Sequence, residues 1–250
     1  MPEARLNPHH PFDLSTSDSD DPVYWVVPRH LAGDDGALAQ QASATLTAAG
    51  WSCWTTARRT LVYVSPDALR GAEWVLPDVP LLLADLPVAW QVSARAVPDQ
   101  ARMAWTAYFT TGTPPEAISA FALALDARPD PADGFDGPNH VMAALTAQGW
   151  RPDVDHSETT AWDARLTCCF TLCALPELIE DQDPREGLAG WQAWAEPAVG
   201  QPPLWGATFS HSTPHDLVSA FAAALASPAP VMRRVLPEAA ADQLTVLPPS

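Results

Sequence analysis

The chain contains no lysine, so all 13 of its basic residues are arginines, against 30 aspartates and glutamates. Its formal net charge is therefore −17 at neutral pH. Phosphate attraction is the main term in non-specific nucleic-acid binding, and a strongly acidic chain opposes it, as it opposes binding to anionic membranes. The negative charge of the chain favours a basic partner.

Cysteines and long apolar runs are also scarce. Four cysteines in 250 residues do not form a disulfide framework. No segment reaches the ~18 consecutive apolar residues of a membrane span, and the first 22 residues lack the apolar core of a signal peptide. These observations predict a cytoplasmic protein without membrane association.

Recognisable catalytic motifs are missing. The sequence has no G-x-S-x-G, no G-x-x-x-x-G-K-[ST], no H-E-x-x-H and no G-x-G-x-x-G. We therefore predict no catalytic residue and no cofactor. An enzyme whose site is assembled only by the tertiary structure remains a third-ranked alternative.

What the chain does contain is an internal repeat. Residues 105–125 and 205–225 are identical at eleven of 21 positions. T-L-T-A-A-G-W at 45–51 likewise matches A-L-T-A-Q-G-W at 144–150, and Trp90-Gln91 matches Trp191-Gln192. Three collinear matches at offsets of 99 to 101 residues indicate a duplication.

The repeated stretch predicts a strand followed by a capped helix. In T-P-P-E, Thr113 is the expected N-cap, Pro114 the first helical residue and Glu116 the partner in a capping box. The apolar residues that follow have helical spacing in both copies: Ile118, Phe121, Ala122 and Leu125, then Val218, Phe221, Ala222 and Leu225. Gly50 and Gly149 are expected to end an earlier helix in each copy.

Segments rich in aromatic and β-branched residues lie between these helices, and they predict strands. They are 51–56, 60–64, 88–94 and 103–110 in the first copy and 165–172, 190–194 and 204–209 in the second, with an extra candidate at 23–27. The expected fold class is α+β: two tandem repeats, each helix, about four antiparallel strands and helix, packed as a pseudo-twofold pair. The expected organisation is a flexible segment 1–22, repeat 1 at 23–128, a linker 129–138, repeat 2 at 139–228 and a tail 229–250.

These motifs resemble a tandem domain-of-unknown-function family of actinobacteria, with the signature W-x-A-x-F…T-P-x-E…A-F…A-L. The resemblance rests on P-R-H-L-A-G (28–33), W-Q-V-S-A-R-A (90–96), W-T-A-Y-F (105–109) and the T-P-x-E helices of both copies. It implies a small cytoplasmic protein with one or two copies of the domain. It implies no catalytic residues.

Charge is distributed unequally between the repeats. Residues 37–128 hold seven acids and six arginines, whereas 139–228 hold eleven acids and three arginines. Arginines beside exposed aromatics on a sheet are typical of single-stranded nucleic-acid sites, so the candidate binding residues of repeat 1 are Trp54, Arg58, Arg59, Arg95 and Arg102. The simpler interpretation, which we favour, is that these arginines solvate a sheet face or pair with acids of repeat 2.

The acidic run 177–186 is the candidate surface for a basic protein, through Glu180, Asp181 and Asp183. It contains no glycine at a bend and has Pro184 after Asp183, which disfavours a calcium loop. A solvated loop is the alternative.

No metal site is predicted. His211 and His215 lack an evident third ligand. Cys168, Cys169 and Cys173 lie in an expected strand, where alternation places the first on the opposite face from the other two. The cysteines are better explained as small buried hydrophobes.

His30 is close in sequence to Asp34 and Asp35 and could form an acid–base pair with them. These residues are more simply interpreted as a strand exit followed by a helix cap.

The leading hypothesis is a non-catalytic interaction module, a protein-binding platform with an acidic second repeat. The alternative is a nucleic-acid-associated protein that uses the Arg/Trp face of repeat 1. The sequence leaves the oligomeric state open.

Overall fold

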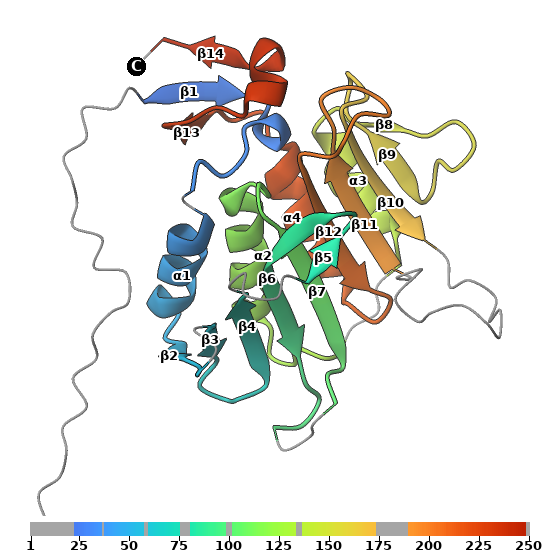
Figure 1. Ribbon diagram of the computed structural model, residues 1–250. Helices are drawn as coiled ribbons and strands as arrows, with labels where there is room; N and C mark the ends of the chain where they lie inside the picture. Colours follow the sequence, from blue (N-terminus) through green and yellow to red (C-terminus); the bar gives the residue numbers. More distant parts are fainter. Residues whose placement is uncertain are drawn as a thin grey trace, which may run out of the picture.

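The computed structural model describes residues 23–36, 38–57, 60–75, 81–98, 102–133, 137–173 and 190–248. The chain has a mixed α+β fold in which every strand pairing is antiparallel (Figure 1). None of the described helices is long and apolar enough to cross a bilayer.

The first half of the chain begins with a short strand and a single 3-10 turn and ends with a long helix. Its elements are β1 (Tyr24–Val27), η1 (Arg29–Leu31), α1 (Leu38–Ala48), β2 (Ser52–Thr55), β3 (Leu61–Val64), β4 (Arg70–Trp74), β5 (Leu82–Leu83), β6 (Leu86–Ala94), β7 (Trp105–Thr110) and α2 (Pro115–Ala127). The expected strand at 23–27 is therefore present as β1.

The second half runs through a similar order of elements and adds a C-terminal extension. Its elements are α3 (Asn139–Ala147), β8 (Arg151–Pro152), β9 (Thr160–Trp162), β10 (Cys168–Cys173), β11 (Gly190–Ala195), β12 (Trp205–Ser210) and α4 (His215–Ala226). The extension contains β13 (Val231–Arg233), η2 (Glu238–Gln243) and β14 (Thr245–Leu247).

Both halves contribute to one large sheet. Its strand order is β2-β3-β4-β6-β7-β12-β11-β10-β9-β8, with β5 paired to β6 at the side. The two halves meet where β7 pairs with β12, and there Tyr108 lies opposite Thr208. The hydrogen-bonded ladder therefore passes from one half to the other without an edge.

The four α-helices pack side by side in the order α1, α2, α4, α3, and the strand residues facing them form the core. At the junction of the halves the core is aromatic: Phe109 stacks on Phe221 at 5.4 Å, and Phe121 lies 5.6 Å from Phe209, between ring centroids. All four rings are at most 1% exposed. Each half therefore completes the core of the other.

The helix starts differ from the expected capping box. Helix α2 begins at Pro115, and Pro114 is its N-cap without a side-chain cap hydrogen bond. The Thr113 hydroxyl instead donates to the carbonyl of Thr110, and both oxygens of Glu116 accept from Arg233, at 2.7 and 2.8 Å. The prediction was wrong because a distant arginine competes for the Glu116 carboxylate. The left-handed glycines are confirmed, with φ of 84° at Gly50 and 85° at Gly149.

A small second sheet ties the two ends of the described chain together. Strand β1 lies between β13 and β14, in the order β13-β1-β14 (Figure 1). Arg233 of β13 is 2% exposed, and its Nε donates to the carbonyl of Gly33 at 2.9 Å, in addition to its bond to Glu116. The C-terminal extension is thus anchored to the first half.

The aromatic junction yields a stability prediction. Replacing Phe221 by alanine removes contacts with Phe109, Phe170 and Phe209, and we expect a loss of about 3–5 kcal/mol in the free energy of unfolding, measured by urea denaturation. The control Leu123→Ala, at a side chain 53% exposed on α2, should change it by less than about 0.5 kcal/mol. Equal effects of the two substitutions would contradict the assigned core.

Candidate binding site on the open face of the sheet

Alternation along the strands gives the large sheet two chemically different faces. On β12, Trp205 and Phe209 point to the helices and are at most 1% exposed, whereas Gly206 and Thr208 belong to the opposite face. That opposite face, which we call the open face, carries mostly polar and half-buried side chains. The part of the chain that the structure describes has all four α-helices on the other side.

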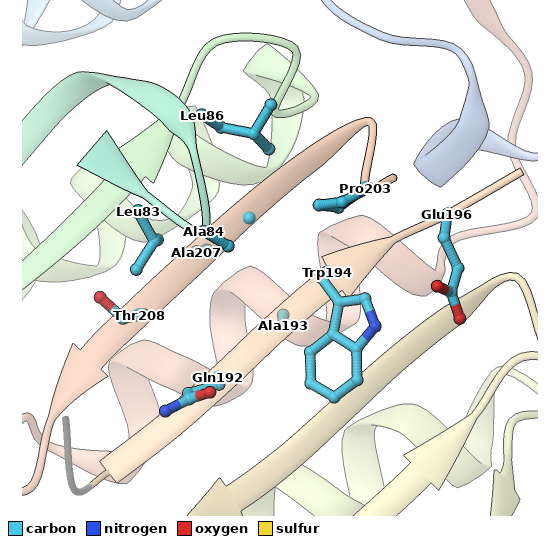
Figure 2. A pocket seen from close by; sticks show the side chains of 11 residues that line it. Leu83, Ala84, Leu86, Gln192, Ala193, Trp194, Glu196, Pro203, Ala207 and Thr208 are labelled. Atoms are coloured by element: carbon cyan, nitrogen blue, oxygen red, sulfur yellow. The ribbon is translucent and has the colours of Figure 1, made fainter. Parts of the chain in front are cut away.

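A pocket with a volume of about 320 Å³ lies on the open face next to the junction of the halves. Figure 2 shows Leu83 and Ala84 on one side of it and Trp194 and Glu196 on the other. The pocket thus has one wall from the β5 hairpin of the first half and another from β11 of the second half, and its volume lies at the low end of small-ligand sites.

Local backbone geometry places the hairpin over the second half. Ala84 and Asp85 form the two-residue turn between β5 and β6, and both have positive φ, 49° and 64°, as in a type I′ turn. Leu83 then reaches over Gly206, where a methyl group would lie 3.6 Å from Leu83 Cδ2. Because Gly206 has no side chain, the floor of the pocket stays open beneath the hairpin.

Three groups give the pocket its chemistry. The Trp194 indole is half-buried and packs edge-to-face with Trp162, with ring centroids 6.1 Å apart. Glu196 lines the pocket, and its Oε2 accepts a hydrogen bond from the amide of Gly200 at 3.2 Å. Thr208 is 5% exposed, and its hydroxyl has no hydrogen-bond partner among the described residues. The pocket combines an aromatic wall, a carboxylate and an unsatisfied hydroxyl.

The corresponding place in the first half has the opposite charge. Just beyond β6, the amide of Arg95 donates to Leu69, and just beyond β11, the amide of Glu196 donates to Thr167. Arg95 therefore stands where Glu196 stands, and the cavity beside it has a volume of about 100 Å³. The two halves present different sites on the same face.

The structure separates the predicted nucleic-acid residues that it describes. Trp54 is 48% exposed on the edge strand β2. Arg95 follows β6, three strand spacings or roughly 14 Å across the sheet, and its guanidinium contacts Met103 Sδ at 3.3 Å. Arg102 is exposed.

Two groups of predicted binding residues lie outside the described residues. They are Arg58 and Arg59, and the acids Glu180, Asp181 and Asp183. The residues of the pocket were not predicted, because they become neighbours only through the pairing of β7 with β12.

A second polar cluster surrounds His30. Its Nε2 lies 3.2 Å from Thr167 Oγ1 and 3.6 Å from Asp163 Oδ2. Burial lowers the pKa of His30 to about 4, against the opposing charge of Asp163, so the ring is neutral at pH 7. In a catalytic relay the hydroxyl and the carboxylate bond different nitrogens of the histidine ring, whereas here both lie near Nε2. The Asp163 carboxylate instead accepts the amides of Thr167 and Cys168, at 2.5 and 2.7 Å, which indicates a structural role.

The pairing of His30 with Asp34 or Asp35 considered from the sequence does not occur. Asp34 Oδ2 accepts from the amide of Gly112 at 2.9 Å, and Asp35 Oδ2 accepts from the amide of Arg234 at 2.7 Å. His30 meets an aspartate of the second half because η1 packs against α4 of that half. The Trp205 indole likewise donates to the carbonyl of His30, at 2.8 Å.

The cysteines of β10 have the chemistry of core residues. Cys168 and Cys169 are at most 1% exposed. Burial raises the pKa of the Cys168 thiol well above its usual value, and that of Cys169 to about 12. Within the described ranges, no three His, Cys, Asp or Glu side chains are grouped as metal ligands would be; His215 is buried, edge-on to Trp191.

The His30 cluster predicts a pH dependence of stability. The unfolded imidazole takes up a proton near pH 6.5 and the folded one only near pH 4, so the free energy of unfolding should fall as the pH drops from 6.5 to 4. For a shift of this size the loss is at most about 3 kcal/mol. Denaturation of His30→Gln across this range should show a shallower decline, whereas the exposed-site control His156→Gln should match the parent. Parallel curves for the parent and His30→Gln would refute the assignment.

Comparison with known proteins identifies a family for the chain. Residues 64–132 and 174–231, together more than half of the chain, match the family model described as SPDY: Domain of unknown function (DUF317). The two matched regions fall in different halves of the structure. No curated protein and no solved structure matches the chain.

Proposed function

The chain belongs to the DUF317 family, and from that premise we propose that it is a non-catalytic, protein-binding platform of the cytoplasm. The platform is the open face of the sheet, and its acidic second half attracts a basic partner protein. One observation carries the proposal: the pocket on this face has walls from both halves, Leu83 on one side and Trp194 and Glu196 on the other.

We also propose that the two halves are tandem α+β repeats related by a pseudo-twofold axis. The register between β7 and β12 supports this. Tyr108 lies opposite Thr208, its counterpart at an offset of 100 residues, while Ala107 faces Phe209 and Phe109 faces Ala207. A twofold axis between Tyr108 and Thr208 exchanges these pairs.

Charge supports a basic partner. The second half has eleven acids and three arginines between 139 and 228, and Glu196 brings one of these acids to the pocket. Complementary charge raises association rates and selects against partners of the same sign. The acids Glu180, Asp181 and Asp183 extend the same charge along the sequence.

The second candidate is a nucleic-acid-associated protein. The exposed indole of Trp54 favours it, since exposed aromatics stack on unpaired bases. The net charge of −17 and the separation of Trp54 from Arg95 argue against it. Arg58, Arg59 and Arg102 would supply the remaining phosphate contacts.

The platform predicts that a bulky charge on the open face abolishes partner binding. Thr106 belongs to this face on β7, so Thr106→Arg should reduce the recovered partner at least tenfold in affinity purification from nuclease-treated lysate. The matched control Leu123→Arg, on the exposed side of α2, should leave recovery unchanged. Circular dichroism on both variants checks that they fold.

Two outcomes would reject the platform. One is a partner that is lost equally with Leu123→Arg, and the other is no partner that survives nuclease. Nucleic acid recovered only from untreated lysate would promote the second candidate. Its affinity should then fall steeply with salt and weaken in Arg58→Ala/Arg59→Ala.

A further inference from the structure

The pocket has a chemistry that selects a particular group. Resting on the proposed platform, we propose that the pocket between β5 and β11 binds the guanidinium group of an arginine side chain on the partner protein. The side chains on each side of the pocket favour this group. In the first half the equivalent position holds a positive charge, so the guanidinium is expected in the second half.

The aromatic and acidic side comes from β11 and the residue after it. Trp194 and Glu196 are two residues apart on the open face and line the same pocket (Figure 2). An indole ring attracts a cation that lies over its face. A guanidinium is a flat, weakly hydrated cation, so it can stack on the indole and bond a carboxylate at the same time. In the described part of the chain no basic side chain forms an ion pair with Glu196.

The apolar side suits the stem of an arginine. Leu83 and Leu86 come from the hairpin, and Pro203 lies across from them in Figure 2. Arginine buries its three methylene groups along apolar surface while its charged end reaches a polar group. A cavity of about 320 Å³ admits one such side chain rather than a folded element.

Thr208 gives a third, independent indication. Its side chain lines the pocket, is 5% exposed, and has a hydroxyl without a partner among the described residues. A buried polar group left unsatisfied is unfavourable, so a ligand that bonds this hydroxyl gains from it. Guanidinium carries five N–H donors in a plane, more than one carboxylate accepts, so it can also supply a donor to a hydroxyl in the wall.

A comparison with the first half indicates that the arginine binds in the second half. Arg95 takes the place of Glu196 there, and Ser93 precedes it where Trp194 precedes Glu196. The cavity beside Arg95 has a volume of about 100 Å³ and is lined from the β4 side, by Leu69 and Gly71, and not by β7, and the charge of Arg95 would repel an arginine. Of these two cavities, the one beside Glu196 is the one that fits a cation.

A peptide with one arginine tests the proposal directly. The probe is acetyl-Gly-Gly-Arg-Gly-Gly-amide, titrated into the full chain with ¹⁵N-labelled tryptophan; Trp194→Phe identifies the Trp194 indole resonance. We expect this resonance to shift with the arginine peptide and not with the citrulline peptide, which has nearly the same shape but no charge. Raising the salt concentration should weaken binding.

Substitutions then locate the site. Glu196→Gln and Trp194→Ala should each raise the dissociation constant about tenfold, within the range for a charge pair or an indole–cation contact. Glu238→Gln removes the same charge from an exposed position in η2 and should leave binding unchanged. Thermal unfolding of each variant confirms that it is folded.

The inference is overturned if the citrulline peptide binds equally well, if Glu238→Gln weakens binding as much as Glu196→Gln, or if the Trp194 resonance does not respond. These results do not test whether the open face is a protein-binding platform. A partner that is still lost with Thr106→Arg but retained with Glu196→Gln would keep the platform and reject the arginine pocket.

Discussion

The fold depends on the antiparallel pairing of β7 with β12. This pairing turns two edges into the centre of one sheet, so that neither the strand of Phe109 nor the strand of Phe209 is left as an unpaired edge. Phe109 and Phe209 stand on the helix side of these strands and pack against Phe121 and Phe221 of α2 and α4. The helices must then lie in the order α1, α2, α4, α3, because α2 and α4 follow directly from the central strands.

The ends of the described chain reinforce that junction by crossing it. The segment after β1 contacts the second half, where the carbonyl of His30 accepts from Trp205 and Arg29 bonds the carbonyl of Ala224. The C-terminal extension returns to the first half through Arg233 and Glu116. An ion pair between Arg128 and Asp216 links the helix ends. The two halves therefore share polar contacts as well as a core.

The proposed function rests on the face of the sheet that the junction leaves uncovered. Helices on one face of the sheet leave the other face to its own side chains, and the β5 hairpin crosses the junction to form the pocket with Trp194 and Glu196. The equivalent positions after β6 and β11 differ in charge, Arg95 in one half and Glu196 in the other. In the proposed platform, this difference between the halves would orient the partner in one direction.

The sequence by itself determined the local elements. Helical spacing predicted that Phe121 and Phe221 lie on buried faces, the glycines at 50 and 149 predicted helix ends, and the matching stretches predicted two similar orders of elements. It missed β4, β5, β8, β9, β13 and β14, because none of them has a longer run of β-branched and aromatic residues. It also missed that the Glu116 carboxylate would bond Arg233, 117 residues away, and not the start of its own helix. Local sequence preferences cannot predict that a distant arginine will bond a carboxylate expected to cap its own helix.

Only the tertiary structure decided the site. Leu83 and Trp194 are far apart in sequence and line the same pocket, and His30 and Asp163 are also far apart in sequence and lie side by side; both arrangements arise because strands and ends from different halves pack together. Periodicity reports which face of an element is apolar, and it carries no record of which other element covers that face. The pocket and the buried histidine are therefore properties of the assembled sheet, whereas the strands and helices that form it could be predicted from the residues they contain.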